Sequence, residues 1–175
     1  MGDKFRTLPG LPASGPLPLQ FSTTGQGLHR EGFVVEFWPG TENAWVGNFQ
    51  PGLSTFDAIA EHPNGKDVVV VAGGDLLVVD PARREQIATL SGTIQSCTLA
   101  SELPALVFDD GISILILHTN GMLEQTARIS WDGMRDIHVE GTVLSGEAYD
   151  PMADSWHSFR VDLLEAEFEG GSYRL

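Results

Sequence analysis

The sequence predicts an all-β fold, a propeller-like array of about three four-stranded antiparallel meanders preceded by an N-terminal hairpin. Nearly every apolar segment is short and bounded by turn residues, and helical patterns are scarce. A four-strand pattern also recurs, with its third strand closing at Asp80, His118 and Asp162, which lie 38 and 44 residues apart. That spacing is typical of β-propeller blades. A β-sandwich built from the same hairpins is the alternative architecture.

The N-terminal part of the chain divides into an arm and the first strands. Residues 1–26 form a Pro/Gly-rich arm, because residues 7–18 hold four of the ten prolines. Proline lacks the amide donor and fixes φ, so the arm is extended and either packs along the domain or stays loose. Residues 27–175 are expected to be a single all-β domain. Segments 32–38 and 44–49 flank a turn and predict a hairpin.

The first meander begins with residues 53–62, which could make two helical turns but read better as a strand. This strand runs into a turn at Pro63-Asn64-Gly65. Two apolar strands, DVVVVAG and DLLVVD, are joined at Gly73-Gly74, a pair that tolerates the positive φ of tight hairpins. Asp80-Pro81 then turns the chain into EQIATL.

Two further meanders are read in the same way. The second consists of TIQSCTLA, PALVFDD, ISILILH and MLEQTARI, with turns at Asp110-Gly111 and Asn120-Gly121. The third consists of RDIHVE, TVLSGEAYD, SWHSFRVDL and a short EFEG, with a turn at Gly141 and the loop PMAD. Acidic and apolar residues alternate over the last strand, which suits a solvated sheet edge.

Two resemblances accompany this pattern. Residues 62–90, HPNGKDVVVVAGGDLLVVDPARREQIATL, resemble a blade of the YVTN and PQQ-type propellers, which implies a blade-like meander and no catalytic or cofactor residues. The elements ISWDG (129–133), YDPM (149–152) and GGSY (170–173) are similar to the ending of a group of small uncharacterised bacterial proteins. Related endings are expected to carry Gly in the last hairpin, where this chain has Leu164-Glu165-Ala166, so we expect that hairpin to be irregular.

The charge balance is strongly acidic. The chain has 24 acidic and 10 basic residues and a formal net charge of −14, and residues 101–175 alone contain 14 acidic and 4 basic residues. Nucleic acid and anionic membranes are disfavoured as partners, because both are bound through Lys and Arg. The charge either serves solubility or attracts a basic protein partner.

No cofactor or metal site is predicted. Phosphate-binding glycine loops are absent, and the five histidines occur singly, without zinc-ligand spacing. Asp150 and Asp154 could offer oxygen to calcium, but a turn capped by Asp150 is the favoured interpretation. The single Cys97 lies in an apolar stretch and reads as a buried side chain. Without a signal sequence or a membrane-spanning run, a soluble, cytoplasmic protein is expected.

The tryptophans provide the most informative surface hypothesis. Trp is mostly buried, so core packing is the plain interpretation of all four. Exposed beside acidic loops, however, Trp anchors protein contacts or stacks on sugars. We therefore predict a candidate partner-binding surface in the third meander, consisting of Trp131, Asp132, Tyr149, Asp150, Asp154 and Trp156.

The functional hypothesis is a noncatalytic protein that binds a basic partner, as an immunity- or antitoxin-like inhibitor would. Catalysis is not expected: Ser155 and His157 are close in sequence, but nothing indicates an oxyanion hole. Two alternatives are a carbohydrate- or small-ligand-binding β module and a self-assembling structural protein, for which a homodimer is the simplest form.

Overall fold

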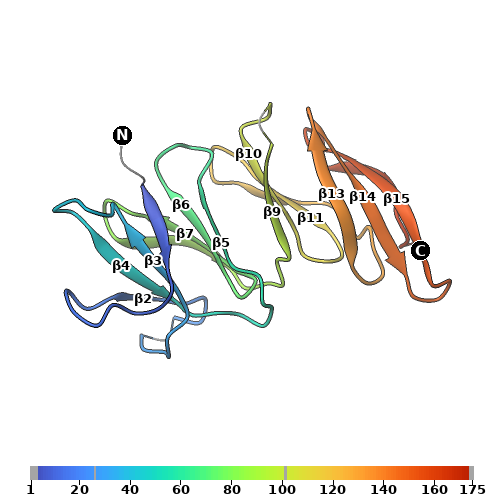
Figure 1. The fold of residues 1–175 in the computed structure, drawn as a ribbon. Coiled ribbons are helices and arrows are strands. Elements are labelled where there is room, and N and C mark those ends of the chain that lie inside the picture. Colours follow the sequence, from blue (N-terminus) through green and yellow to red (C-terminus); the bar gives the residue numbers. More distant parts are fainter. Residues whose placement is uncertain (1–3, 26, 101, 174–175) are drawn as a thin grey trace. The chain divides into compact units, whose positions relative to one another are not determined.

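The structure is a computed structural model that describes residues 4–25, 27–100 and 102–173. It is all-β, with sixteen strands in four four-stranded sheets (Figure 1). The described residues contain no helix that is long and apolar enough to cross a membrane. The chain divides into two compact units, which we call the N-terminal unit (Met1–Glu61 and Asp67–Thr93) and the C-terminal unit (His62–Lys66 and Ile94–Leu175).

The first sheet contains the predicted hairpin and two strands from the arm. Its order is β1-β3-β4-β2, with bounds Phe5–Leu8, Phe33–Phe37, Trp45–Phe49 and Leu19–Phe21. The arm therefore packs along the sheet and supplies both edge strands, one antiparallel to β3 and one parallel to β4. Residues 1–3 and Gln26 of the predicted arm lie outside the described residues.

The three predicted meanders are confirmed, each as an antiparallel sheet with its strands in sequence order. The first comprises β5 Ala58–Glu61, β6 Val68–Ala72, β7 Asp75–Asp80 and β8 Glu85–Leu90. The second comprises β9 Ser96–Ala100, β10 Ala105–Asp109, β11 Ile114–Leu117 and β12 Leu123–Gln125. The third comprises β13 Met134–Glu140, β14 Val143–Asp150, β15 Ser155–Asp162 and β16 Glu167–Gly170.

Turn chemistry explains the strand connections. Gly73 and Gly74 join β6 to β7 with φ of 53° and 83°, the conformation that tight hairpins require and that glycine adopts without strain. In the last hairpin, Ala166 takes the left-handed conformation itself, with φ of 53°. The Asp162 carboxylate accepts the Leu164 N–H at 2.9 Å, and Asp162 pairs with Glu167 across the turn. The hairpin thus closes with an alanine in a position that favours glycine.

Each unit has one apolar core between two sheets. In the N-terminal unit, stacked rings of Phe37 and Trp45, 4.2 Å apart, pack with β6 and β7 residues such as Val70 and Leu77. In the C-terminal unit, Ile116 of β11 belongs to the same cluster as Leu144 of β14 and Phe159 and Val161 of β15. Paired sheets of this kind are consistent with both a propeller-like and a sandwich arrangement.

Candidate functional site

Three segments of the C-terminal unit meet at the end of strand β14. The Ser172 hydroxyl donates to the Tyr149 carbonyl at 2.7 Å and accepts the Trp131 N–H at 3.1 Å. The Ser130 hydroxyl donates to the Gly133 carbonyl at 2.6 Å, and the Ser172 and Tyr173 N–H groups both donate to the Ile129 carbonyl at 3.0 Å. The elements ISWDG, YDPM and GGSY, far apart in sequence, therefore form one hydrogen-bonded corner, which we call the C-terminal corner.

Two glycines allow the chain to approach this corner closely. Gly170 and Gly171 have φ of 82° and 84°. A Cβ on Gly170 would lie 2.3 Å from the Ser158 carbonyl oxygen, and one on Gly171 would lie 2.6 Å from the Ile129 carbonyl oxygen. A side chain at either position would collide with backbone, so the Gly-Gly pair is a packing requirement.

Trp131 lies on the exposed side of the corner. It is 40% exposed, and its ring packs in a T-shaped arrangement with the Tyr173 ring, with centroids 4.5 Å apart. The Arg128 guanidinium lies over both rings, 5.3 Å from Trp131 and 4.8 Å from Tyr173, and donates to the Trp131 carbonyl at 2.7 Å. The cation–π contacts position the indole, and the hydrogen bond fixes the backbone that carries it.

Trp156, on strand β15, lies in a second aromatic group of the C-terminal unit. Its ring is 5.0 Å from that of Tyr149, its partner in the β14–β15 register. The Arg135 guanidinium is 4.1 Å from the Trp156 ring and forms a 2.7 Å ion pair with Glu147. Arginines thus contact both tryptophans of the candidate surface, and the indole of Trp156 is half-buried.

The Tyr149 hydroxyl contacts one aspartate of the candidate surface and feels the charge of the other two. This hydroxyl donates to Asp154 at 2.7 Å. The hydrogen bond to Asp154, together with the negative charges of Asp154, Asp132 and Asp150, raises the pKa of Tyr149. The structure therefore brings the predicted residues Asp132, Tyr149, Asp150 and Asp154 into one electronegative neighbourhood.

Asp150 also shapes the loop that follows. Its carboxylate accepts the Met152 N–H at 2.9 Å and the Ala153 N–H at 3.3 Å, the turn-capping arrangement expected from the sequence. Asp154 has φ of 46°, a conformation that Asp adopts more readily than most residues. Met152 is 89% exposed at the tip. The loop therefore presents an apolar side chain between two carboxylates.

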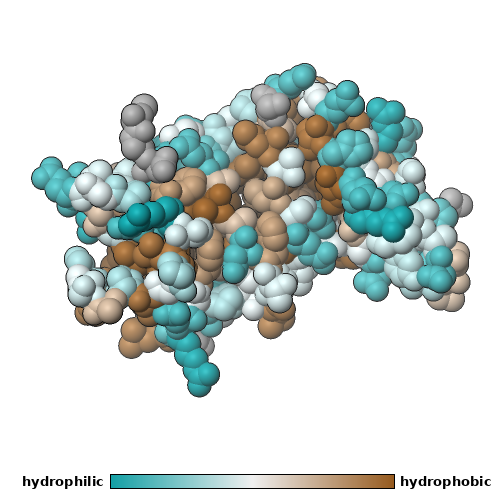
Figure 2. Space-filling model, viewed as in Figure 1, coloured by the Kyte–Doolittle hydropathy of each residue, from teal (hydrophilic) through white to brown (hydrophobic). Residues whose placement is uncertain are grey.

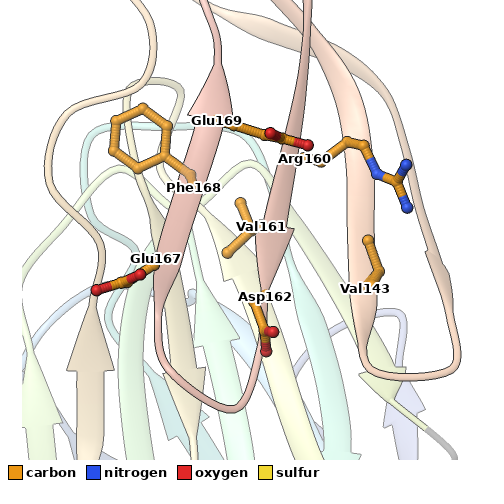
Figure 3. Close-up of a pocket in the computed structure, with 7 residues that line it drawn as sticks. All are labelled: Val143, Arg160, Val161, Asp162, Glu167, Phe168 and Glu169. Atoms are coloured by element: carbon orange, nitrogen blue, oxygen red, sulfur yellow. The ribbon is translucent and has the colours of Figure 1, made fainter.

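The surface over β14 and β15 is mainly hydrophilic, as Figure 2 shows. A cavity of about 410 Å³ lies beside β16, and Figure 3 shows Phe168 and Glu169 leaving that strand on opposite sides. Glu167 and Glu169 are exposed on this edge strand, as predicted, and face Asp162 and Arg160 in the register.

Ser155, His157 and Asp150 lie together but do not form a catalytic triad. The Ser155 hydroxyl contacts His157 Nε2 at 3.0 Å, and Asp150 Oδ2 approaches the same nitrogen at 3.9 Å. In a triad the carboxylate contacts Nδ1 and leaves Nε2 to accept the hydroxyl proton. Here both neighbours compete for one nitrogen, so Asp150 is not placed to orient the imidazole as a base.

Cys97 and the metal-ligating side chains are the remaining candidates for chemistry. Burial raises the pKa of the half-buried Cys97 thiol to about 11, which opposes nucleophilic chemistry. Among the described residues, no group of three or more His, Cys, Asp or Glu side chains is placed to hold a metal ion.

Sequence reasoning missed the residues that support this surface. Arg128 and Arg135 carry no local signal, and Ser172 belongs to the GGSY element without its role being apparent, because each acts on residues that are brought near only by folding. The sequence also could not tell which tryptophans are exposed. Trp45 is 5% exposed and donates its indole N–H to the Pro81 carbonyl at 3.1 Å, whereas Trp131 is exposed to solvent.

No protein-family model matches the chain, and no curated protein matches it either.

Proposed function

We propose that this protein binds a basic protein partner without catalysis, through a surface formed by Trp131, Asp132, Tyr149, Asp150, Asp154 and Trp156. The observation that carries the proposal is the hydrogen bond from the Tyr149 hydroxyl to Asp154, within the field of Asp132 and Asp150, on a unit that also exposes the Trp131 indole beside Arg128. An immunity- or antitoxin-like inhibitor is the concrete form of this function.

The chemistry of the surface suits such a partner. Rigid aromatic anchors with neighbouring charges are typical of residues that dominate protein interfaces. Carboxylates around them favour Lys and Arg side chains on the partner and accelerate the encounter electrostatically. Met152, exposed at the loop tip, adds an adaptable apolar contact. The net charge of −14 extends this attraction beyond the contact itself.

The test begins with affinity capture from a lysate of the source cells, followed by measurement of Kd with the purified captured protein. The test variant carries Asp132→Asn, Asp150→Asn and Asp154→Asn, which removes three charges and keeps the hydrogen-bond acceptors. We expect Kd to rise by about tenfold or more, mostly through slower association, and added salt to weaken the wild-type complex.

The matched control removes the same charge elsewhere. Glu42→Gln, Glu61→Gln and Glu85→Gln alter exposed residues of the N-terminal unit. If both triple variants raise Kd by the same factor, net charge rather than the proposed surface drives association. Binding that survives the aspartate variant and high salt contradicts the proposal.

A further inference from the structure

The N-terminal unit contains a cavity of about 380 Å³ that is separate from the C-terminal corner. Its walls come from the β6–β7 hairpin and from loops at residues 23–24, 50–53 and 91–93. The volume lies in the range of small-molecule sites. None of the lining residues, all of which are described, is basic.

A buried carboxylate forms part of this wall. Asp75, directly after the Gly73-Gly74 turn, is 6% exposed. It accepts hydrogen bonds from the Thr23 hydroxyl at 2.7 Å, the Ser91 hydroxyl at 3.1 Å and the Gly92 N–H at 3.0 Å. Gly52 makes room for it, since a Cβ there would lie 2.7 Å from the Asp75 carboxylate carbon.

The hydrogen bonds to Asp75 determine which donors and acceptors the cavity wall has left for a ligand. A hydroxyl has one proton to donate. The protons of Thr23 and Ser91 are committed to Asp75, so both oxygens retain only lone pairs for another partner. Gln50 also lines the cavity, but its Oε1 is closed off from solvent, so the acceptors open to a ligand are those around Asp75.

The rim is apolar. Leu53 is 96% exposed and adjoins Gly52 and Pro51 in the lining. A ligand with a donor-rich, positively charged head and an aliphatic stem would therefore find acceptors inside and an alkyl surface at the mouth.

We propose that this cavity binds a primary ammonium group carried on an aliphatic chain, with Asp75 as counter-ion and the Thr23 and Ser91 oxygens as acceptors. The ammonium belongs either to a free small amine or to a lysine side chain of another protein. The site is independent of the proposed function, because it lies in the other unit.

The first test is a titration of the isotope-labelled full-length protein with n-butylammonium, followed by NMR. We expect saturable shifts of amide signals from residues 23–24, 50–53 and 91–93. The neutral n-butanol and the donor-free tetramethylammonium ion should produce none. Equal shifts with n-butanol, or no saturable shifts with n-butylammonium, would overturn the proposal.

Variants then locate the site. Asp75→Asn should weaken n-butylammonium binding by about tenfold or more, since a charge-assisted hydrogen bond is lost. Because Asp75 also ties loops together, Gly92→Val provides a second probe: a Cβ there meets only the Gly74 carbonyl oxygen, 3.7 Å away. Gly92→Val should abolish binding while the circular dichroism spectrum stays unchanged.

The matched control is Gly27→Val, a glycine of the same unit that has open space around it and does not line the cavity. It should bind n-butylammonium as the wild type does. Binding retained in Gly92→Val would contradict the assignment. A comparison of n-butylammonium with Nα-acetyl-lysine amide, whose side-chain ammonium is free, separates the two sources. Tighter binding of the lysine derivative assigns the site to a protein side chain, and tighter binding of the alkylammonium assigns it to a free amine.

Discussion

The hydroxyl of Ser172 donates a hydrogen bond of 2.7 Å to the backbone carbonyl of Tyr149. Ser172 is 4% exposed and also accepts the N–H of Trp131, so one buried side chain joins segments 23 and 41 residues away from it. Since it fixes the backbone that carries two aromatic residues of the candidate surface, its removal should affect both stability and the position of those rings.

Ser172→Ala is expected to lower the free energy of unfolding by about 1–3 kcal/mol, because the Trp131 N–H loses its acceptor and the Tyr149 carbonyl keeps only a 3.4 Å contact with the Ser130 hydroxyl. Urea denaturation followed by circular dichroism measures the change. Ser158→Ala, at an exposed position on β15, is the control and should stay within about 0.5 kcal/mol of the wild type. Equal stability of the two variants would show that the Ser172 hydrogen bonds contribute nothing net.

Gly171→Ala should destabilise the protein more than Gly133→Ala. Both glycines have positive φ, 84° and 88°, so alanine costs about 1–2 kcal/mol of backbone strain at either position. Only at Gly171 would the new Cβ also collide with a backbone oxygen, because nothing lies within 4 Å of a Cβ on Gly133. Thermal unfolding of the two variants gives the comparison, and similar midpoints would contradict the close packing.

The phenol of Tyr149 is expected to ionise at higher pH than an ordinary tyrosine, because the Asp154 hydrogen bond and the surrounding carboxylates oppose the phenolate. Asp154→Asn should move the pKa of Tyr149 back toward its usual range, as measured by tyrosinate absorbance, with Tyr149→Phe identifying the signal. Asp136→Asn, an exposed aspartate of β13, should leave it unchanged.

The same shift links pH to stability. The pKa of Tyr149 is higher in the folded than in the unfolded protein, so the neutral phenol stabilises the fold below the ordinary tyrosine value of about 10. This contribution is lost as pH rises through the raised pKa. Urea midpoints should therefore fall less steeply in alkali for Tyr149→Phe than for the wild type; parallel curves would contradict this.

Cys97 should react slowly with thiol reagents in the native protein. Burial raises its pKa to about 11, so at pH 8 it holds roughly a hundredfold less thiolate than an ordinary cysteine. Labelling with a chromogenic disulfide in buffer and in urea measures the difference, and the rate should rise sharply on unfolding. A native rate that matches the unfolded rate would show that the thiol is accessible and ordinary.

The strands and turns could be predicted because their signals are local. Segments such as Val68–Ala72 and Ile114–Leu117 are apolar at every position, as strands buried on both faces are, and Gly73-Gly74 supplies the dihedral angles of its turn. The six candidate residues were proposed from sequence because aromatic and acidic residues cluster around two short loops, and their partner-binding role stays a prediction. The contacts of Arg128, Arg135 and Ser172 could not be predicted, because they exist only after folding.

The sequence by itself therefore determined the all-β class and the three meanders, since side-chain alternation and turn chemistry involve neighbouring residues. Tertiary structure alone decided that the proline-rich arm supplies both edge strands of the first sheet, one of them parallel. It also decided that Trp45 is buried while Trp131 is exposed, and that Asp75 lines a cavity. These outcomes depend on long-range pairing and on which faces are covered, and no local pattern encodes either one.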